Sequence, residues 1–101
     1  MDGDGDCFQV SADLVVDVPS EPLTLVHGTV VGTGVPRHPH AWVEFEEDGE
    51  WMVLDRSNGH HWVGPRDTYY RLGQVQDVKR YTRTEAFAHL LRTEHYGPWD
   101  V

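Results

Sequence analysis

Cys7, His40 and Asp55 supply the three side-chain types of a thiol–imidazole–carboxylate site. A cysteine acts as a nucleophile when a neighbouring base takes its proton, and a carboxylate fixes the tautomer of that base and stabilises its charged form. Cys7 is the only cysteine, so the chain can form neither an internal disulfide nor a multi-thiolate zinc cluster. The thiol is therefore either a small buried hydrophobe or a reactive group.

The segments that carry His40 and Asp55 are predicted to form a β-hairpin. Residues 40–46 alternate in the manner of a strand, and residues 51–55 form the returning strand. Between them lies the dipeptide Asp48-Gly49, which favours a tight turn.

The turn sets the register of this hairpin. With Asp48 and Gly49 at its centre, Glu47 faces Glu50, Phe45 faces Met52, and Val43 faces Leu54. Asp55 then lies opposite Trp42 and diagonal to His40 on the same face of the sheet, within reach of a long side chain. The sequence therefore predicts contact between His40 and Asp55, with Asn58 as the alternative orienting residue if this parity fails.

Cys7 is predicted to lie at the start of a helix. Asp6 is a suitable N-cap, Gln9 three residues later completes a capping-box pattern, and Pro19 ends the segment. The positive end of a helix dipole favours a thiolate, and its free backbone N–H groups can stabilise an oxyanion. The helix start is thus a suitable position for a nucleophile.

The remaining segments complete an α+β domain. Strands are expected at residues 23–31 and 75–81, loops at 32–39 and 56–65, and the segment 67–72 is ambiguous. A second capping box, formed by Thr82 and Glu85, begins a C-terminal helix that should bury Phe87, Leu90 and Leu91. The total is two helices and about four antiparallel strands in a single domain over residues 1–101.

These motifs resemble those of the transglutaminase-like and papain-like cysteine enzymes. The likeness covers about the first 60% of the chain: Gly5-Asp6-Cys7 opening a helix, the strand from His40 through Ala-Trp-Val-Glu-Phe, and the strand Trp51-Met-Val-Leu-Asp55. It implies a minimal papain-like core, with the nucleophile helix packed on an antiparallel sheet. It also implies that Cys7 is the nucleophile, His40 the general base and Asp55 the orienting carboxylate. The oxyanion glutamine that papain-like enzymes carry upstream of the cysteine has no counterpart here, so the second oxyanion donor is not identified.

The function expected from these residues is cysteine-dependent acyl transfer through a thioester, without a cofactor. Peptide or isopeptide hydrolysis, as by a thiol protease, and deamidation or transglutaminase-like transfer all remain open. The expected substrate is a protein or peptide in an open groove, with Trp42, Gln9, Asn58 and His60 as cleft-lining candidates. The alternative is a catalytically inactive protein of the same fold that binds or inhibits a protein partner.

Charge and hydrophobicity disfavour several other classes. The formal net charge of −9, without a basic stripe, argues against nucleic-acid binding. No apolar run approaches the roughly 20 residues of a membrane span. The acidic N-terminus is unlike a signal peptide, so a cytoplasmic protein is expected.

Metal binding is a weaker alternative. The imidazoles of His38, His40, His60 and His61 suit zinc, but they lack a compact ligand motif. A second pattern, formed by Asp2, Asp4, Asp6 and Asp13, has spacing like that of an EF-hand. It lacks the required glycine and the bidentate glutamate, so a solvated acidic segment is the better interpretation.

Overall fold

The computed structural model describes residues 6–18, 22–32, 35–57 and 60–99. The described residues contain three helices and five strands. In chain order these are α1 (Asp6–Asp17), β1 (Thr24–Gly32), β2 (Val35–Glu47), β3 (Glu50–Ser57), β4 (His60–Pro65), α2 (Arg66–Gly73), β5 (Gln76–Tyr81) and α3 (Arg83–Thr93). The α+β class expected from the sequence is confirmed, with one helix and one strand more than expected.

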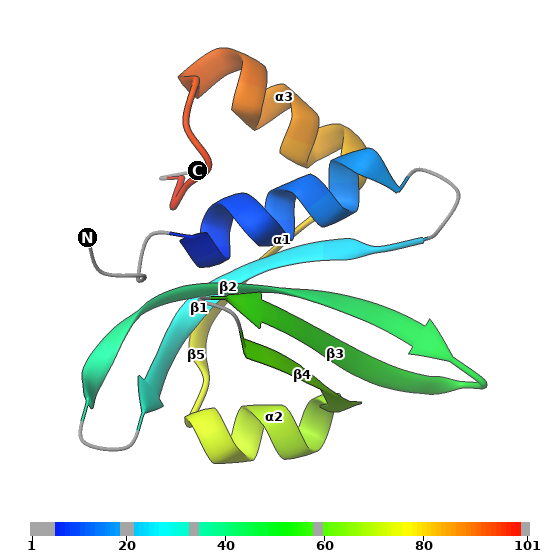
Figure 1. Ribbon diagram of the computed structural model, residues 1–101, viewed down its shortest axis with the longest axis vertical. Helices are drawn as coiled ribbons and strands as arrows, with labels where there is room; N and C mark the ends of the chain where they lie inside the picture. The colour runs from blue at the N-terminus through cyan, green and yellow to red at the C-terminus, as the bar shows by residue number, and fades with distance from the viewer. Residues whose placement is uncertain (1–5, 19–21, 33–34, 58–59, 100–101) are drawn as a thin grey trace.

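The five strands form one antiparallel sheet in the order β4-β3-β2-β1-β5. Helices α1 and α3 cover one face of this sheet, and α2 covers the other (Figure 1). Both faces are therefore buried, and adjacent residues of β2 pack into different cores. Val43 belongs to the core beneath α1 and α3, whereas Trp42 belongs to the core that α2 closes.

The hairpin of β2 and β3 has the register predicted from its turn. Glu47 pairs with Glu50, Phe45 with Met52, and Val43 with Leu54. Asp48 and Gly49 both have positive φ angles, 53° and 83°, as a two-residue hairpin turn of this type requires. The Asp-Gly dipeptide thus fixes which side chains of the two strands share a face.

Two segments expected to be loops are strands instead. β2 begins at Val35, within the expected loop 32–39, and β4 occupies six of the ten residues of the expected loop 56–65, while β3 extends over its first two. Pro36 and Pro39 lie in this part of β2, which pairs with β1 but not with β3. This part of the strand is therefore an edge, where a proline that cannot donate a backbone hydrogen bond is tolerated. β4 is an edge strand, where its terminal Pro65 is likewise acceptable.

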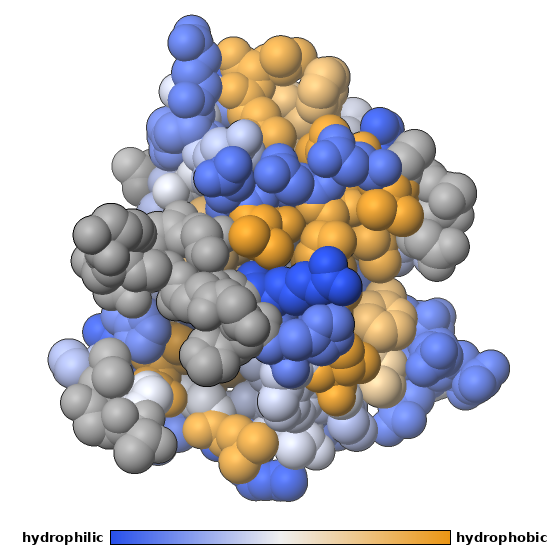
Figure 2. All heavy atoms as spheres, viewed as in Figure 1, coloured by the Kyte–Doolittle hydropathy of each residue, from blue (hydrophilic) through white to orange (hydrophobic). Residues whose placement is uncertain are grey.

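The helices after β4 also differ from expectation. The ambiguous segment 67–72 is helical, within α2. In α3 the Thr82–Glu85 capping box is present, but the buried residue is Ala86, while Phe87 and Leu91 are 49% and 67% exposed. The expectation that Phe87 and Leu91 are buried is wrong, and hydrophobic surface is visible where α3 lies (Figure 2). None of the described helices is long and apolar enough to cross a membrane.

Candidate functional site

The neighbouring strands β2 and β3 separate next to the N-terminus of α1. The paired residues of β2 and β3 end at Val43 and Leu54, although β1–β2 pairing continues to Val35 and β3–β4 pairing continues to Ser57 (Figure 1). Helix α1 packs across both strands, and its first turn lies at this separation, with Cys7 against Ala41. The opening lets a residue of α1 approach a side chain that belongs to the opposite face of the sheet.

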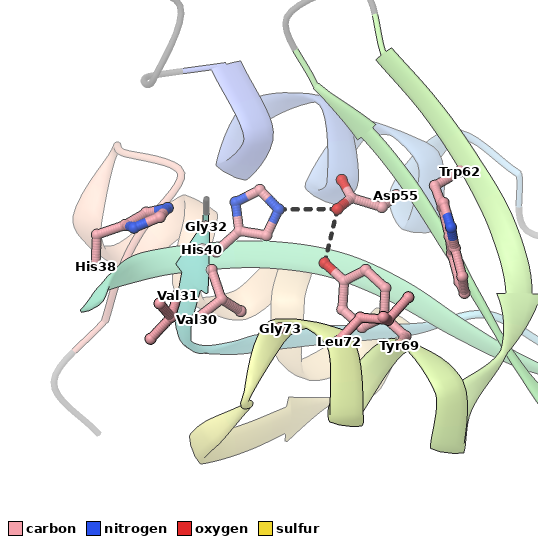
Figure 3. Close-up of a pocket in the computed structure, with 10 residues that line it drawn as sticks. All are labelled: Val30, Val31, Gly32, His38, His40, Asp55, Trp62, Tyr69, Leu72 and Gly73. Atoms are coloured by element: carbon pink, nitrogen blue, oxygen red, sulfur yellow. Dashed lines mark hydrogen bonds and ion pairs between the residues drawn. The ribbon is translucent and has the colours of Figure 1, made fainter. Parts of the chain in front are cut away.

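His40 and Asp55 are in direct contact at this opening. Nε2 of His40 lies 2.9 Å from Oδ2 of Asp55, and the two side chains are only 16% and 15% exposed (Figure 3). The Cys7 side chain forms a hydrogen bond with the same imidazole. Because Asp55 occupies Nε2, Nδ1 is the ring nitrogen left for the thiol. The three residues selected from the sequence therefore meet, with the imidazole between the thiol and the carboxylate.

The electrostatics of the site favour a charged imidazole. Burial opposes the charge on His40, but the hydrogen bonds and negative charges of Asp55 and Cys7 outweigh burial and raise the pKa of His40 to about 10. An ordinary histidine has a pKa of about 6.5. At neutral pH the ring is therefore protonated, and its charge is stabilised by the Asp55 carboxylate.

Tyr69 is a further member of the site, and it lies in the segment 67–72 that the sequence left ambiguous. Its hydroxyl donates a 2.6 Å hydrogen bond to Oδ2 of Asp55, the oxygen that also bonds His40 (Figure 3). Burial, followed by the charge of Asp55, raises the pKa of Tyr69 above its usual range, so the hydroxyl stays a donor. No local motif marks this role, since it depends on the placement of α2 against β3.

Cys7 combines features of a reactive and of a structural cysteine. It is 3% exposed and packs with Phe8 and Ala41, which is typical of a small buried residue. Its hydrogen bond to His40 and its position in the first turn of α1 are typical of an activated thiol.

A cleft of about 340 Å³ lies beside the imidazole (Figure 3). Its polar wall carries His38, His40, Asp55 and Tyr69. The remaining wall is apolar or lacks side chains, and is formed by Val30, Val31, Gly32, Trp62, Leu72 and Gly73. Cys7 is not one of the lining residues, so the cleft reaches the imidazole and the carboxylate rather than the sulfur.

Two of the four candidate lining residues lie elsewhere. Trp42 is fully buried, with its ring centroid 6.0 Å from that of His40, so it supports the imidazole from within the core instead of lining the cleft. Gln9 is exposed and is not among the lining residues, because two positions along a helix turn a side chain by about 200° from Cys7. Asn58 and the side chain of His60 lie outside the described residues.

A buried carboxylate stabilises the core beneath the site. Glu44 is fully buried and accepts hydrogen bonds from Trp42 Nε1 at 3.1 Å and from the Tyr70 hydroxyl. It also forms ion pairs with Arg66 and Arg80, at 3.4 and 3.2 Å. A buried charge with this many partners is compensated, so the network positions Trp42 rather than offering a free acid.

No metal centre is present among the described residues. In that part of the chain no group of three or more His, Cys, Asp or Glu side chains is arranged to hold a metal ion. Of the four histidines considered for zinc, His38 and His40 are neighbours with ring centroids 6.2 Å apart. Asp2, Asp4 and the side chain of Asp6 lie outside the description.

Comparison with known proteins adds no assignment. No protein-family model matches the chain, and neither the curated proteins nor the solved structures contain a significant match. The function has to be argued from the site itself.

Proposed function

We propose that the protein is a small cysteine-dependent acyl-transfer enzyme with Cys7 as nucleophile, His40 as general acid–base and Asp55 as orienting carboxylate. The observation that carries the proposal is the single imidazole that contacts both the thiol of Cys7 and, at 2.9 Å, the carboxylate of Asp55. Each neighbour alone is common in proteins, whereas both on one buried ring form the arrangement that nucleophilic catalysis requires. The arrangement of α1 on the sheet is compatible with a papain-like core.

The reaction follows from the charge state of the pair. The Cys7 thiolate attacks the carbonyl carbon of an amide or ester, and backbone N–H groups at the start of α1 stabilise the oxyanion. The imidazolium of His40 gives its proton to the leaving amine or alcohol as the C–N or C–O bond breaks, which leaves a thioester. His40, now neutral, takes a proton from water or an amine as that nucleophile attacks the thioester carbonyl. The C–S bond then breaks, the acid or the new amide leaves, and the Cys7 thiolate and His40 imidazolium are restored. We infer a protein or peptide as the source of the acyl group.

Alkylation of the purified protein tests the nucleophile without a known substrate. A free thiol, with a pKa of about 8.5, is only about 1% thiolate at pH 6.5. If the charged His40 holds Cys7 as a thiolate, iodoacetamide at this pH should modify Cys7 about tenfold faster than it modifies the thiol of glutathione. A thiolate already formed at pH 6 should also give a rate that changes little up to pH 8, since His40, with a pKa of about 10, keeps its charge over this range. Intact-mass spectrometry over time measures both rates.

Two variants assign the effect to the imidazole. His40→Ala should remove most of the rate advantage while circular dichroism shows a folded protein. His61→Ala removes an exposed histidine whose ring bonds Arg56 rather than Cys7, and should leave the rate unchanged. An ordinary thiol titration in the wild type, or no response to His40→Ala, would exclude the nucleophile role.

The burial of Cys7 favours a second candidate function. A cysteine that is 3% exposed and absent from the cleft wall suits a protein that keeps the fold and binds a protein partner without catalysis. The same alkylation experiment separates the two, since a binding protein has no need of a fast-reacting thiol.

A further inference from the structure

The cleft beside His40 has a chemical character of its own. It is built from the end of β1, from β2, β3 and β4, and from the last turn of α2. Figure 3 shows the His40–Asp55–Tyr69 chain on one wall, with Val30 and Leu72 on the side toward α2. A group bound here would lie against the imidazole. It would therefore lie next to a leaving group that receives its proton from this imidazole.

The polar side chains of the cleft are engaged with protein atoms. Asp55 accepts hydrogen bonds from His40 and Tyr69 through one oxygen, and Nδ1 of His38 lies 2.9 Å from the carbonyl of Pro36. The charges of His40 and Asp55 compensate each other. A charged ligand would find no counter-charge among the lining residues and would lose its hydration. An uncharged ligand loses much less hydration free energy when it enters the cleft.

The remaining wall offers apolar contact. Val30, Trp62 and Leu72 line it, and Leu72 is 67% exposed, so ligand binding would remove its side chain from water. Gly73 leaves part of the space empty. A Cβ at this position would lie 3.7 Å from Val30 Cβ, which is an ordinary contact distance, so an alanine fits and narrows the cleft. A volume near 340 Å³ lies at the small end of ligand pockets, enough for one side-chain-sized group.

We propose that this cleft receives an uncharged aliphatic or aromatic group of the substrate, adjacent to the bond that Cys7 attacks, and that Leu72 and Gly73 of α2 set its polarity and size. The inference rests on the proposed acyl-transfer function, because it uses the cleft as the approach to His40.

Three alkylating probes test the proposal. Iodoacetamide is small and neutral, N-isobutyl-iodoacetamide adds an aliphatic group, and iodoacetate is anionic. Rate constants for Cys7 are divided by those for glutathione, which removes the intrinsic reactivity of each probe. The isobutyl probe should show a ratio about tenfold above that of iodoacetamide, since partial burial of four carbons is worth about one factor of ten in binding. Iodoacetate should show the lowest ratio.

Matched variants locate the effect. Leu72→Asp should abolish the isobutyl advantage, so that the ratio for the isobutyl probe falls to that for iodoacetamide measured on the same variant, and Gly73→Ala should reduce the advantage severalfold. Leu91→Asp is the control, because Leu91 is also a helical leucine that is 67% exposed but lies on α3, away from the cleft. It should keep the full advantage.

The possible outcomes separate this inference from the proposed function. Fast iodoacetamide labelling without an isobutyl advantage, or an advantage that survives Leu72→Asp, overturns the apolar cleft and leaves the nucleophile intact. An ordinary iodoacetamide rate overturns the nucleophile, and the cleft proposal with it. Fast labelling with an advantage that only Leu72→Asp and Gly73→Ala reduce supports both.

Discussion

His27 and His40 are buried histidines on neighbouring strands, in opposite environments. His27 pairs with Ala41 and Gly28 pairs with His40, so the two imidazoles belong to opposite faces of the sheet. His27 is 4% exposed, and neither of its ring nitrogens has a hydrogen-bond partner among the described residues. His40 contacts a carboxylate and a thiol. The comparison separates the effect of burial from the effect of partners.

An aromatic box surrounds His27. Its ring centroid lies 4.8, 5.0 and 4.9 Å from those of Phe8, Tyr81 and Trp99. The pKa of His27 is lowered to about 4, mainly by burial and further by the nearby positive charges of His89 and Lys79. His40 is also buried, yet its pKa is raised to about 10. Burial without an anionic partner therefore keeps a histidine neutral, and an anionic partner reverses this effect.

The largest expected effect comes from removing the partner of His40. In Asp55→Asn the pKa of His40 should fall from its wild-type value of about 10, because burial is then opposed by Cys7 without the carboxylate. The amide also favours the wrong tautomer, so any acyl-transfer activity should drop by at least about a hundredfold. NMR titration of the imidazole resonances measures the pKa. Asp67→Asn, an exposed carboxylate in the first turn of α2, is the control and should change neither quantity. A pKa for His40 that stays near 10 in Asp55→Asn would assign the charge stabilisation to another group.

His27 should make the protein sensitive to acid. Its pKa is lower in the folded state than the unfolded value of about 6.5, so the unfolded chain binds more protons between pH 6.5 and 4. Stability should therefore decrease as the pH falls through this window, with a contribution from His27 of about 3 kcal/mol at most. The variant His27→Leu has no imidazole at this position, so its unfolding free energy lacks this pH-dependent contribution.

Urea unfolding between pH 4 and 7 measures the effect. The free-energy difference between wild type and His27→Leu should shift in favour of the variant as the pH falls. His89→Gln removes one of the opposing charges and should reduce the acid sensitivity only slightly. Parallel pH profiles for wild type and His27→Leu would mean that protonated His27 finds a partner in the folded state.

The sequence predicted the part of the site that depends on local patterns. The Asp48-Gly49 turn and strand alternation determine that Val43 faces Leu54, and this register carries His40 toward Asp55. Helix α1 begins at Asp6, so Cys7 lies in its first turn as predicted, whereas the side chain of Asp6, the predicted N-cap, lies outside the described residues. These features depend on residues close in sequence, where turn chemistry and helix capping are informative.

The parts that could not be predicted depend on long-range packing. Nothing near Tyr69 indicates that α2 will return across the sheet to bond Asp55, and nothing near His27 indicates that Trp99 will cover it. β4 was missed because a short edge strand with two histidines, a glycine and a proline has the composition of a loop. Trp42 was expected at the cleft, but burial of both faces of the sheet draws it into the core.

Two adjacent tyrosines give the smallest effect and the sharpest test of the site. Tyr69 donates to Asp55, and Tyr70 donates to Glu44. Tyr69→Phe removes one of the hydrogen bonds that Oδ2 of Asp55 accepts, and the loss of one hydrogen bond to a carboxylate is worth about 1–3 kcal/mol. The carboxylate is then less firmly oriented, so the labelling rate of Cys7 should fall about three- to tenfold and its pH profile should change. Tyr70→Phe removes an equally aromatic hydroxyl from a carboxylate that keeps Trp42, Arg66 and Arg80 as partners. It should lower the unfolding free energy by a similar amount but leave the labelling profile of Cys7 as in the wild type. If both variants lose stability and neither alters the labelling profile, Tyr69 packs the core in the same way as Tyr70, and the site ends at Asp55.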